Sequence, residues 1–521
     1  MNNYVVLSVF ISLFVLFVAL GFWSSRFRKG DMTDLGEWAL AGRRLGTYLA
    51  WFLVGADLYT AYTFIAIPEF VYASGALYFY AVPYVGMTFG IALITMPRLW
   101  KISKGKNYVT AVDMIHDKFN SRTLALLIAL TGIAAELPYI ALQIYGMQAV
   151  LTVMIGQTVS SNATIITEAA LVIAFVILAA FTFTSGLRGA TVTALMKDAI
   201  IFTTVIVVIV VVTIQVGGFG NALIDMGSVS KPPVTGTGTL ANLYISGFIS
   251  LSLMSAFALY LYPHAINGVL STNSAKKLRY STALLPLYGV GLALLALFGV
   301  LIYASKSALA LTGQYGAVTA VPSLIYAELP DWFVGFAFLG IFIGGLVPAS
   351  IMAISQANLL TRNVIKPFWA KMNPKMETML SKIFSVMFKF IALLFIFVIQ
   401  ATYSLQLQLV GGIISLQTLP AIFLAMYTNK LHKWSMGIGW AAGILLGLGL
   451  LIYRNFVILK SSSIVTTFFV FVNQTSSPFY FLYIGLYALL FNLLIVVVGS
   501  LIEEKLMGRF GKASKKPVSQ N

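Results

Sequence analysis

Several ionisable residues of this chain lie inside long apolar stretches, and Asp57 is the first of them. It sits near the middle of the stretch 46–73, among glycine, tyrosine and threonine residues. A bare carboxylate surrounded by lipid is costly, so the group must be paired, ion-bound or protonated. Asp57 is therefore predicted to form a coupling-ion or proton site. The alternative is a structural salt bridge, or a hydrogen bond to a nearby helix end.

A second polar group surrounds Glu136, which precedes Pro138 in another apolar stretch. Tyr139 and Gln143 share one helix face at i, i+4 spacing, so Gln143 is predicted to line a cavity. Glu136 either joins this polar stripe or reaches toward the outer interface from a helix kinked at Pro138. The residue types alone do not separate these two readings.

Lys197 and Asp198 are predicted to open the stretch 196–218 at its cytoplasmic end. They either neutralise each other at the interface or form an inner gate or second ion site. Arg188 is expected to act only as a topology determinant. His264 follows Pro263 and is either a proton relay, since imidazole titrates near neutrality, or part of a capped helix end.

Proline and glutamine residues mark two further places. Pro348 cannot donate a hydrogen bond to the carbonyl of Gly344, and this freed carbonyl beside Ser350 is a candidate cation ligand. A tolerated kink packed by small residues is the alternative. Gln417, the deepest glutamine of the stretch 405–428, is predicted to line a path.

Composition places these residues in a membrane. The chain has 521 residues, is 59% hydrophobic and 9% charged, and contains many apolar runs of about 20 residues. Its net charge of +17 comes from short loops between those runs, which does not suggest nucleic acid. Cysteine is absent, the scattered histidines form no haem or metal pair, and no segment fits a nucleotide-binding loop. No obligate protein partner is evident, and the lipid bilayer is the expected surrounding.

Thirteen apolar segments are predicted to cross the membrane. They are 4–23, 46–73, 76–97, 123–155, 164–184, 196–218, 241–263, 281–304, 332–360, 381–402, 405–428, 435–453 and 477–501. Alternating them across a bilayer puts 28 of the 33 Lys and Arg residues on one side and only Lys231, Lys306, Arg454 and Lys460 on the other. The positive-inside rule then predicts a multi-pass plasma-membrane protein with its N-terminus outside and its C-terminus cytoplasmic. Two glycosylation sequons, at Asn162 and Asn473, fall in predicted outside loops.

The order of the segments predicts an internal repeat. Ten helices divide into two sets of five, 46–218 and 241–428, and an odd number inverts the second set relative to the first. An extra helix within 1–30, two C-terminal helices within 435–501 and a cytoplasmic tail, 502–521, complete the chain. Each set opens with an irregular helix. The first contains GADLYTAYT (55–63) and Pro68, and the second contains SGFISLSLMS (246–255) and breaks at Pro263. Paired irregular helices of this kind predict a binding site at mid-membrane.

The same stretches resemble the sodium:solute symporter family, and within it the bacterial and archaeal monocarboxylate permeases. The matching stretches are 40–68, 96–100, 108–115, 137–151, 181–202, 258–271, 346–363 and 407–421. They occur in the right order from about residue 35 to 435. The resemblance implies an all-α membrane protein of thirteen helices with the inverted five-plus-five core of amino-acid transporters. It also implies alternating access and small carboxylates as cargo.

Two departures from the family pattern concern the coupling ion. Sodium symporters of the family usually have hydroxyl residues where Val347 and Pro348 stand, and these complete a sodium site with carbonyls near Ala56 and Tyr59. The membrane aspartate of the family aligns one position away from Asp57. Proton coupling is therefore an alternative to sodium, although the monocarboxylate branch shares the Val-Pro version.

These observations predict a cation-coupled symporter for lactate, pyruvate, acetate or a similar monocarboxylate, and not an enzyme. No cofactor is expected, and Na⁺ or H⁺ is the coupling ion. The predicted substrate-binding residues are Tyr59, Thr60, Thr63, Gln143, Ser252 and Gln417. The predicted ion-coupling residues are Ala56, Asp57, Tyr59, Asp198, Gly344, Val347 and Pro348. The alternatives are a symporter of the same fold for an amino acid or a sugar, and, more remotely, a membrane sensor.

Overall fold

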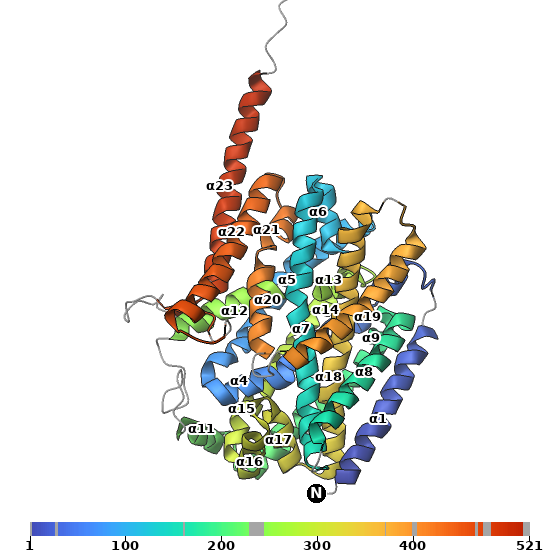
Figure 1. Ribbon diagram of the computed structural model, residues 1–521, viewed down its shortest axis with the longest axis vertical. Helices are drawn as coiled ribbons and strands as arrows, with labels where there is room; N and C mark the ends of the chain where they lie inside the picture. Colours follow the sequence, from blue (N-terminus) through green and yellow to red (C-terminus); the bar gives the residue numbers. More distant parts are fainter. Residues whose placement is uncertain are drawn as a thin grey trace, which may run out of the picture.

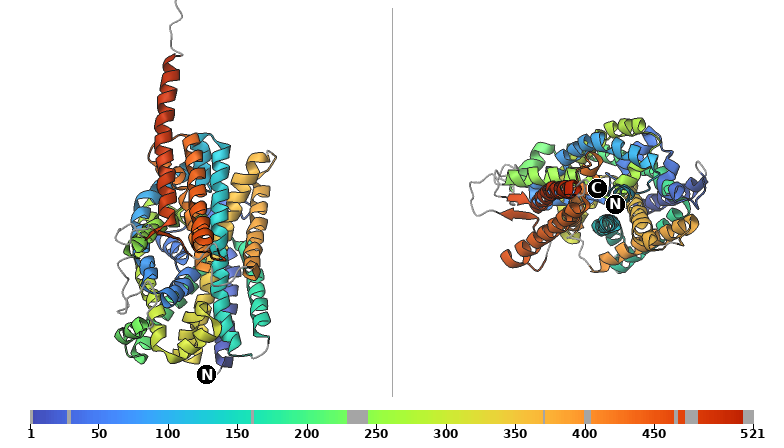
Figure 2. Two further views of the ribbon diagram at one scale, coloured as in Figure 1. Left: turned by 60° about the vertical axis from the view of Figure 1, so that its left-hand side comes forward. Right: turned by 90° about the horizontal axis from the view of Figure 1, so that it is seen from above.

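The computed structural model describes residues 3–26, 30–159, 162–228, 244–369, 371–398, 404–463, 467–471 and 481–513. Nearly all of this part of the chain is helical, with most long helices running along one axis (Figures 1 and 2). Only one short antiparallel ribbon interrupts the described helices, formed by β1 (Phe469–Phe471) and β2 (Phe481–Tyr483). The expectation of a helical membrane protein is confirmed, and the ribbon is an addition to it.

The helices have the following bounds. They are α1 (Asn3–Trp23), α2 (Leu35–Leu40), α3 (Thr47–Ala56), α4 (Ile67–Ser74), α5 (Ala81–Gly105), α6 (Ala111–Phe119), α7 (Arg122–Gly156), α8 (Ala163–Ser185), α9 (Leu187–Val207), α10 (Thr213–Gln215), α11 (Phe219–Ser228), α12 (Ile245–Leu259), α13 (Pro263–Leu270), α14 (Ala275–Leu284), α15 (Pro286–Leu301), α16 (Lys306–Tyr315), α17 (Ala320–Glu328), α18 (Asp331–Asn358), α19 (Pro374–Val398), α20 (Ser404–Leu416), α21 (Leu419–Ile422), α22 (Lys433–Ile452) and α23 (Ile484–Ala513).

Among the described residues, ten helices are long and apolar enough to cross a membrane, or up to twelve if each of two bent pairs is one span. Thirteen spans and the inverted repeat therefore stay predictions. The structure describes only one of the two predicted glycosylation sequons and does not describe Lys231. Asn162 immediately precedes α8, whereas Asn473 and Lys231 lie outside the described residues.

Three breaks interrupt the spans. The first separates α3 from the π-helical turn Tyr62–Ala66, as the sequence predicts for residues 55–63. The second bends α12 against α13 by 50°, and the third bends α20 against α21 by 52°. The third break, at Gln417 and Thr418, was not expected from the sequence.

The predicted break at Pro263 is confirmed, because α12 ends at Leu259 and α13 begins at Pro263. The predicted irregularity over 246–255 is wrong, because these residues lie within the regular helix α12. Their serine hydroxyls bond to carbonyls of the same helix, Ser250 to Gly247 and Ser252 to Phe248. The break falls instead at 260–262, directly before Pro263, whose ring and missing N–H disfavour a continuous helix.

The position of α9 also differs from the prediction. This helix begins at Leu187 rather than at residue 196, so Lys197 and Asp198 lie at its middle, fully buried, and not at an interface. Lys197 is consequently not a loop residue and does not contribute to the positive-inside count. The remaining basic loops keep the same strong asymmetry.

Close helix packing depends on glycine at a few points around the breaks. Gly299 of α15 faces α4, where an added Cβ would overlap the carbonyl oxygen of Pro68 and lie 2.9 Å from Cβ of Val71. Small residues allow membrane helices to approach in this way. The half of the broken span that follows the first break is therefore held against α15.

We predict that Gly299→Ala lowers the thermal unfolding midpoint of the purified protein, because overpacking at such contacts costs about 1–3 kcal/mol. Gly86→Ala in α5 is the matched control, since nothing lies within 4 Å of its added Cβ. Unfolding followed by tryptophan fluorescence in detergent measures both variants. Equal midpoints for the two would contradict this account of the α4–α15 contact.

Candidate functional site

The first break exposes backbone carbonyls that bind a lysine side chain. The Nζ of Lys197 on α9 donates to the carbonyl oxygens of Ala56, at 3.0 Å, and Tyr59, at 2.8 Å. The same ammonium lies 3.1 Å from Oδ1 of Asp198, whose Oδ2 accepts a 2.6 Å hydrogen bond from the hydroxyl of Tyr288. The charge is thus bound by the end of a half-helix, which carries partial negative charge.

The helix that resumes after this break is capped from within the protein. Oε1 of Gln143 on α7 accepts from the backbone N–H of Ala61 at 2.9 Å. The hydroxyl of Thr63 accepts from the N–H of Thr60 at 2.9 Å, and the hydroxyl of Thr60 accepts from the N–H of Tyr62 at 3.1 Å. These groups satisfy the N–H donors that a helix start leaves open.

Asp57 lies inside the first break and is only 4% exposed. Neither of its carboxylate oxygens has a hydrogen-bond partner among the described residues. His264 and Lys197 both act on it electrostatically. A buried polar group left in this way calls for an explanation, and a bound ion or a proton is one. The role of Asp57 in ion coupling stays a prediction.

Glu136 on α7 binds the start of α13, directly after the second break, which the sequence alone did not predict. Its Oε1 accepts from the backbone N–H of His264 at 3.1 Å and lies 2.6 Å from Nδ1 of the same residue. Both of its carboxylate oxygens are 2.9 Å from the hydroxyl of Ser355 on α18. Glu136 is fully buried and joins α7, α13 and α18 at the start of α13, so it does not reach the outer interface. His264 belongs to a capped helix end, with Nε2 buried and unpartnered in the described part of the chain.

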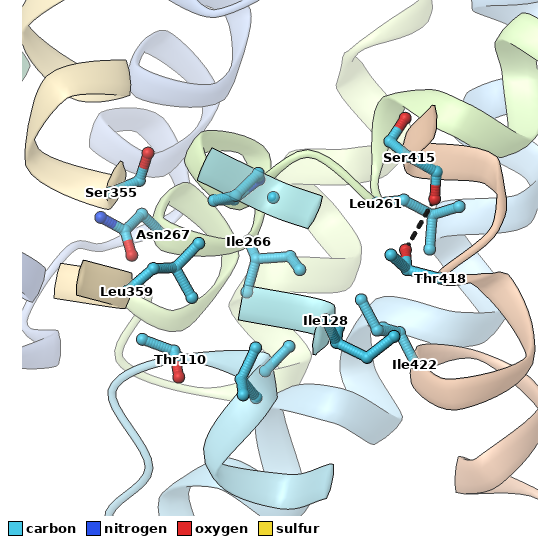
Figure 3. Close-up of a pocket in the computed structure, with 14 residues that line it drawn as sticks. Thr110, Ile128, Leu261, Ile266, Asn267, Ser355, Leu359, Ser415, Thr418 and Ile422 are labelled. Carbon is cyan, nitrogen blue, oxygen red and sulfur yellow. Dashed lines mark hydrogen bonds between the residues drawn. The ribbon is translucent and has the colours of Figure 1, made fainter. Parts of the chain in front are cut away.

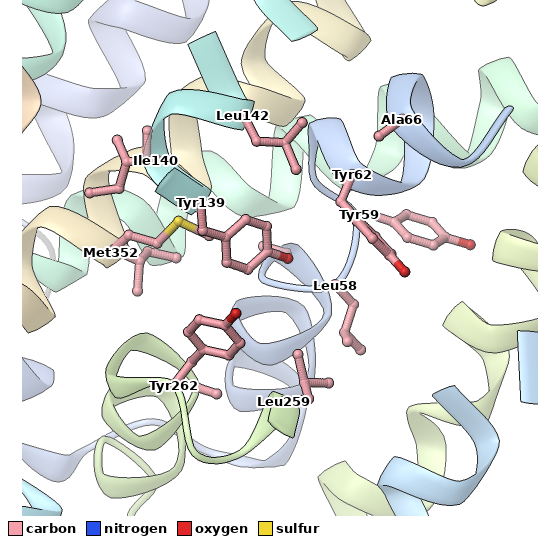
Figure 4. Close-up of a cluster of buried hydrophobic side chains, with 14 of the residues drawn as sticks. Leu58, Tyr59, Tyr62, Ala66, Tyr139, Ile140, Leu142, Leu259, Tyr262 and Met352 are labelled. Atoms are coloured by element: carbon pink, nitrogen blue, oxygen red, sulfur yellow. The ribbon is translucent and has the colours of Figure 1, made fainter. Parts of the chain in front are cut away.

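A cavity lies on one side of the second break and is rich in tyrosine. It is narrow, with about 340 Å³ of atom-free space that is partly open to solvent, and it lies between η3 (Tyr62–Ala66), α5, α12, α20 and β2. Its lining comprises Tyr62, Tyr84, Met254, Ser255, Ala258, Leu259, Tyr262, Gln408, Leu409, Gly412 and Tyr483. Figure 4 shows the ring of Tyr262 next to that of Tyr139, with the two ring centroids 5.6 Å apart and the planes tilted by 57°. Hydroxyl and amide groups, rather than charges, dominate the polar part of the lining.

A second cavity lies beyond the same break, where α6 and α21 are found (Figures 1 and 3). It is also narrow, with about 430 Å³ of atom-free space that is partly open to solvent, and its polar lining residues are Thr110, Asn267, Ser355, Ser415 and Thr418. Leu261 and Pro263 line this cavity, whereas Leu259 and Tyr262 line the first. The unwound residues before α13 therefore stand between the two cavities.

The residues predicted to bind substrate do not line these two cavities. Ser252 bonds to the carbonyls of Phe248 and Tyr80. The Tyr59 ring packs against Phe202 and Tyr288, and its hydroxyl lies where a Cβ on Gly291 would fall. Thr60, Thr63 and Gln143 cap the first break, as described above.

Gln417 faces away from the expected path. Its Oε1 accepts from Asn492 of α23 at 3.1 Å, and an added Cβ on Gly443 of α22 would overlap it. It therefore joins α20 to the C-terminal helix pair, and the prediction that it lines a path is wrong. The depth of a glutamine in a helix does not reveal which neighbour that side of the helix contacts.

Three predicted ion-coupling positions lie on α18, which is continuous through Pro348. Gly344 faces Ile201 and Phe64, within 3.7 Å of an added Cβ. Val347 and Pro348 are buried and have no side-chain oxygen, and the hydroxyl of Ser350 is bonded to the Val347 carbonyl at 2.8 Å. Ala56, Tyr59 and Asp198 meet at Lys197, so the structure brings three of the seven predicted residues together. The three on α18 are not among the described contacts of the Lys197 ammonium.

Sequence reasoning did not assign a substrate role to Tyr62, Tyr262 or Gln408, which line the first cavity. Tyr62 and Tyr262 are close in sequence to the two breaks, at Asp57 and Pro263. That closeness could have identified them as cavity-lining residues. The hydroxyl of Tyr262 donates to the carbonyl of Gln408 at 3.2 Å, so the cavity wall links α12 to α20.

The chain is similar to known transport proteins in both sequence and fold. The model of the sodium:solute symporter family, whose coupling ion is Na⁺, matches residues 38–443. The monocarboxylate transport permease protein of Rhizobium johnstonii is 40% identical over 447 residues, 85% of this chain and 87% of the relative. The uncharacterized symporter YodF of Bacillus subtilis is 31% identical, covering 92% and 90%. A solved Na⁺-coupled sialic acid symporter, substrate-bound and outward-open, has a TM-score of 0.71 at 13% identity, with 96% of this chain and 98% of that one covered.

We predict that Glu136→Ala strongly destabilises the protein, because removing one partner of a buried ion pair costs about 3–5 kcal/mol. Glu136→Gln keeps the shape and an acceptor, and is expected to lose less. Glu504→Gln, at an exposed position of α23, is the control. Thermal unfolding in detergent measures all three, and a Glu136→Ala midpoint equal to that of the control would overturn the capping role.

Proposed function

This chain belongs to the sodium:solute symporter family, and we propose that it is a secondary active transporter for a small monocarboxylate such as lactate, pyruvate or acetate. Uptake would be coupled to a cation, Na⁺ or H⁺. Members of the family and the solved neighbour are transporters, and the chain is not an enzyme. It is embedded in a membrane through many spans.

The observation that carries the proposal is the pair of cavities on the two sides of the unwound residues before α13. Alternating access needs a central site that opens to one side at a time, and broken helices at mid-membrane are the usual place for it. The residues 260–262 would form part of the partition, with Tyr139 and Tyr262 beside it (Figure 4). Movement of α12 and α13 would then connect the substrate to one cavity or the other.

We place the substrate carboxylate in the tyrosine-lined cavity. The hydroxyls of Tyr62, Tyr84 and Tyr262 and the amide of Gln408 lie in the lining of this cavity. To donate to the carboxylate, the Tyr262 hydroxyl would exchange its bond to the Gln408 carbonyl, and the Tyr62 hydroxyl its bond to the Tyr80 hydroxyl. No Lys or Arg is among the residues that line this cavity. An enclosed site of mainly apolar and hydroxyl character suits a small solute with one carboxylate. The name of the relative from Rhizobium johnstonii supports this substrate class.

The finer topology belongs to the same proposal. Counting α3, η3 and α4 as one broken span, separate from α5, and joining each bent pair gives the thirteen predicted spans. The excess of basic residues in one set of loops supports a cytoplasmic C-terminus and an outside N-terminus in the plasma membrane. Asp57 remains our candidate for the group that binds the coupling ion or proton.

A transport assay in proteoliposomes tests the substrate class. Labelled lactate should accumulate above equilibrium when a sodium or proton gradient is imposed, and unlabelled pyruvate or acetate should compete. Protein-free vesicles measure the passive entry of the acid. Competition by an amino acid or a sugar, but by no monocarboxylate, would favour the alternative cargo.

We predict that Tyr262→Phe raises the KM for lactate by about two- to tenfold, the equivalent of one lost hydrogen bond, with a smaller effect on the maximal rate. Tyr48→Phe removes a hydroxyl from a side chain that is 74% exposed and serves as the control. Initial rates of uptake over a range of lactate concentrations give both constants. An unchanged KM for Tyr262→Phe would exclude this hydroxyl from the substrate site.

A further inference from the structure

The carbonyls at the end of α3 have a cation-binding arrangement, and the chain itself supplies the cation. An unwound half-helix end in a transporter presents carbonyl oxygens and a partial negative charge, which together favour a positive ion. Here the ammonium of Lys197 donates to two of these oxygens, those of Ala56 and Tyr59. It is completely buried, so water does not compete for them.

The opposite wall does not complete a sodium site. A hard cation such as Na⁺ takes oxygen ligands. The positions on α18 where the family resemblance implies hydroxyls are Val347 and Pro348, which have no side-chain oxygen. The nearby hydroxyl of Ser350 is bonded to a carbonyl of its own helix. With no side-chain oxygen from Val347 or Pro348, the oxygens at this place are the two carbonyls and Asp198, and the Lys197 ammonium already occupies all three.

The charges around Lys197 support the same reading. Asp198 lies 3.1 Å away on α9, and the Tyr288 hydroxyl of α15 holds its other oxygen. Asp57, from the break itself, acts electrostatically on the ammonium, and Tyr59 packs against Tyr288. The ammonium thus lies against the Asp198 carboxylate and two backbone carbonyls, which all favour its charged form.

We infer that Lys197 is a built-in cation that replaces Na⁺ at the Ala56–Tyr59 carbonyl pair, joining α3 to α9 without a bound ion. The symporter would then need no Na⁺ at this position, in contrast to the pattern of its family. Any coupling ion would act elsewhere, with Asp57 the nearest candidate. Two experiments test this inference. The first measures thermal unfolding and is independent of the proposed function, whereas the second measures lactate exchange and rests on it.

Removing the side chain should convert the place into a sodium site. Lys197→Ala leaves two carbonyl oxygens and the freed Oδ1 of Asp198, which are ligands that Na⁺ accepts. We predict that replacing choline with Na⁺ at constant ionic strength raises the unfolding midpoint of Lys197→Ala by more than that of the wild type. A ligand that binds only the folded state stabilises it in proportion to its occupancy. Lys197→Ala with Asp198→Asn should lose this response.

Lys389→Ala is the matched control. Lys389 is also a buried membrane lysine, on α19, but its Nζ contacts Ser385 at 3.1 Å rather than the broken helix. Its variant should respond to Na⁺ as the wild type does. If Lys197→Ala does not fold, Lys197→Gln keeps a donor without the charge and takes its place. A Na⁺ response in the Lys197 variant no larger than in the wild type would overturn the inference.

The second experiment uses exchange of labelled for unlabelled lactate in proteoliposomes without an ion gradient. In choline, Lys197→Ala should lose exchange by about tenfold or more relative to wild type, as expected for a buried charge pair broken on one side, and Na⁺ should restore part of it. Lys197→Arg retains a permanent charge and should remain independent of added Na⁺. Wild-type protein that exchanges no monocarboxylate, yet shows the expected midpoint shifts, would refute the substrate and leave the lysine assignment intact. Full exchange by Lys197→Ala in choline would refute the assignment.

Discussion

Where a helix breaks inside a membrane, its freed N–H and C=O groups must find partners within the protein, because lipid offers none. This constraint organises the centre of the molecule. The carbonyls at the end of α3 bind Lys197, and the N–H at the start of the following half is bound by Gln143. At the second break, the N–H of His264 is bound by Glu136. All three partners come from the long helices α7 and α9, so these two helices serve as the frame against which the broken spans are placed.

The same partners define what can move. Glu136 also contacts Ser355 of the buried helix α18, so α13 is tied to the most enclosed part of the bundle. Tyr262, by contrast, bonds to the carbonyl of Gln408, and α20 is itself a broken helix. The partition between the two cavities is therefore anchored on one side by a charged cap and on the other by neutral contacts of Tyr262 with α20. In the proposed transport cycle, this asymmetry would let the site change shape at the α12–α20 contact while its capped end stays in place.

Much of the fold was predictable because lipid imposes a simple pattern. Runs of apolar residues located most of the helices to within a few residues, and the polar cluster at 55–63 located the first break. The serine-rich stretch 246–255 misled, since hydroxyls in a helix can bond to carbonyls of their own turn and leave it regular. Lys197 was wrongly predicted to lie at a helix end, although it lies in the middle of α9. A basic residue near the edge of an apolar run looks like a loop residue, although its helix begins ten residues earlier, at Leu187.

By itself, the sequence determined that this is a membrane protein, which segments form most of its helices, and to which family it belongs. Hydrophobic runs and ordered motifs are properties of the chain alone. It also placed Asp57 in the first helix break, where the structure has it. Only the tertiary structure decided what each polar side chain does. Lys197 and Ala56 are 141 positions apart, and Glu136 and His264 are 128 apart. Contacts between such distant positions depend on which helix faces meet, and a local pattern of residues contains no information about the partner on the opposite face. For the same reason Gln417, expected beside a path, lies against α23.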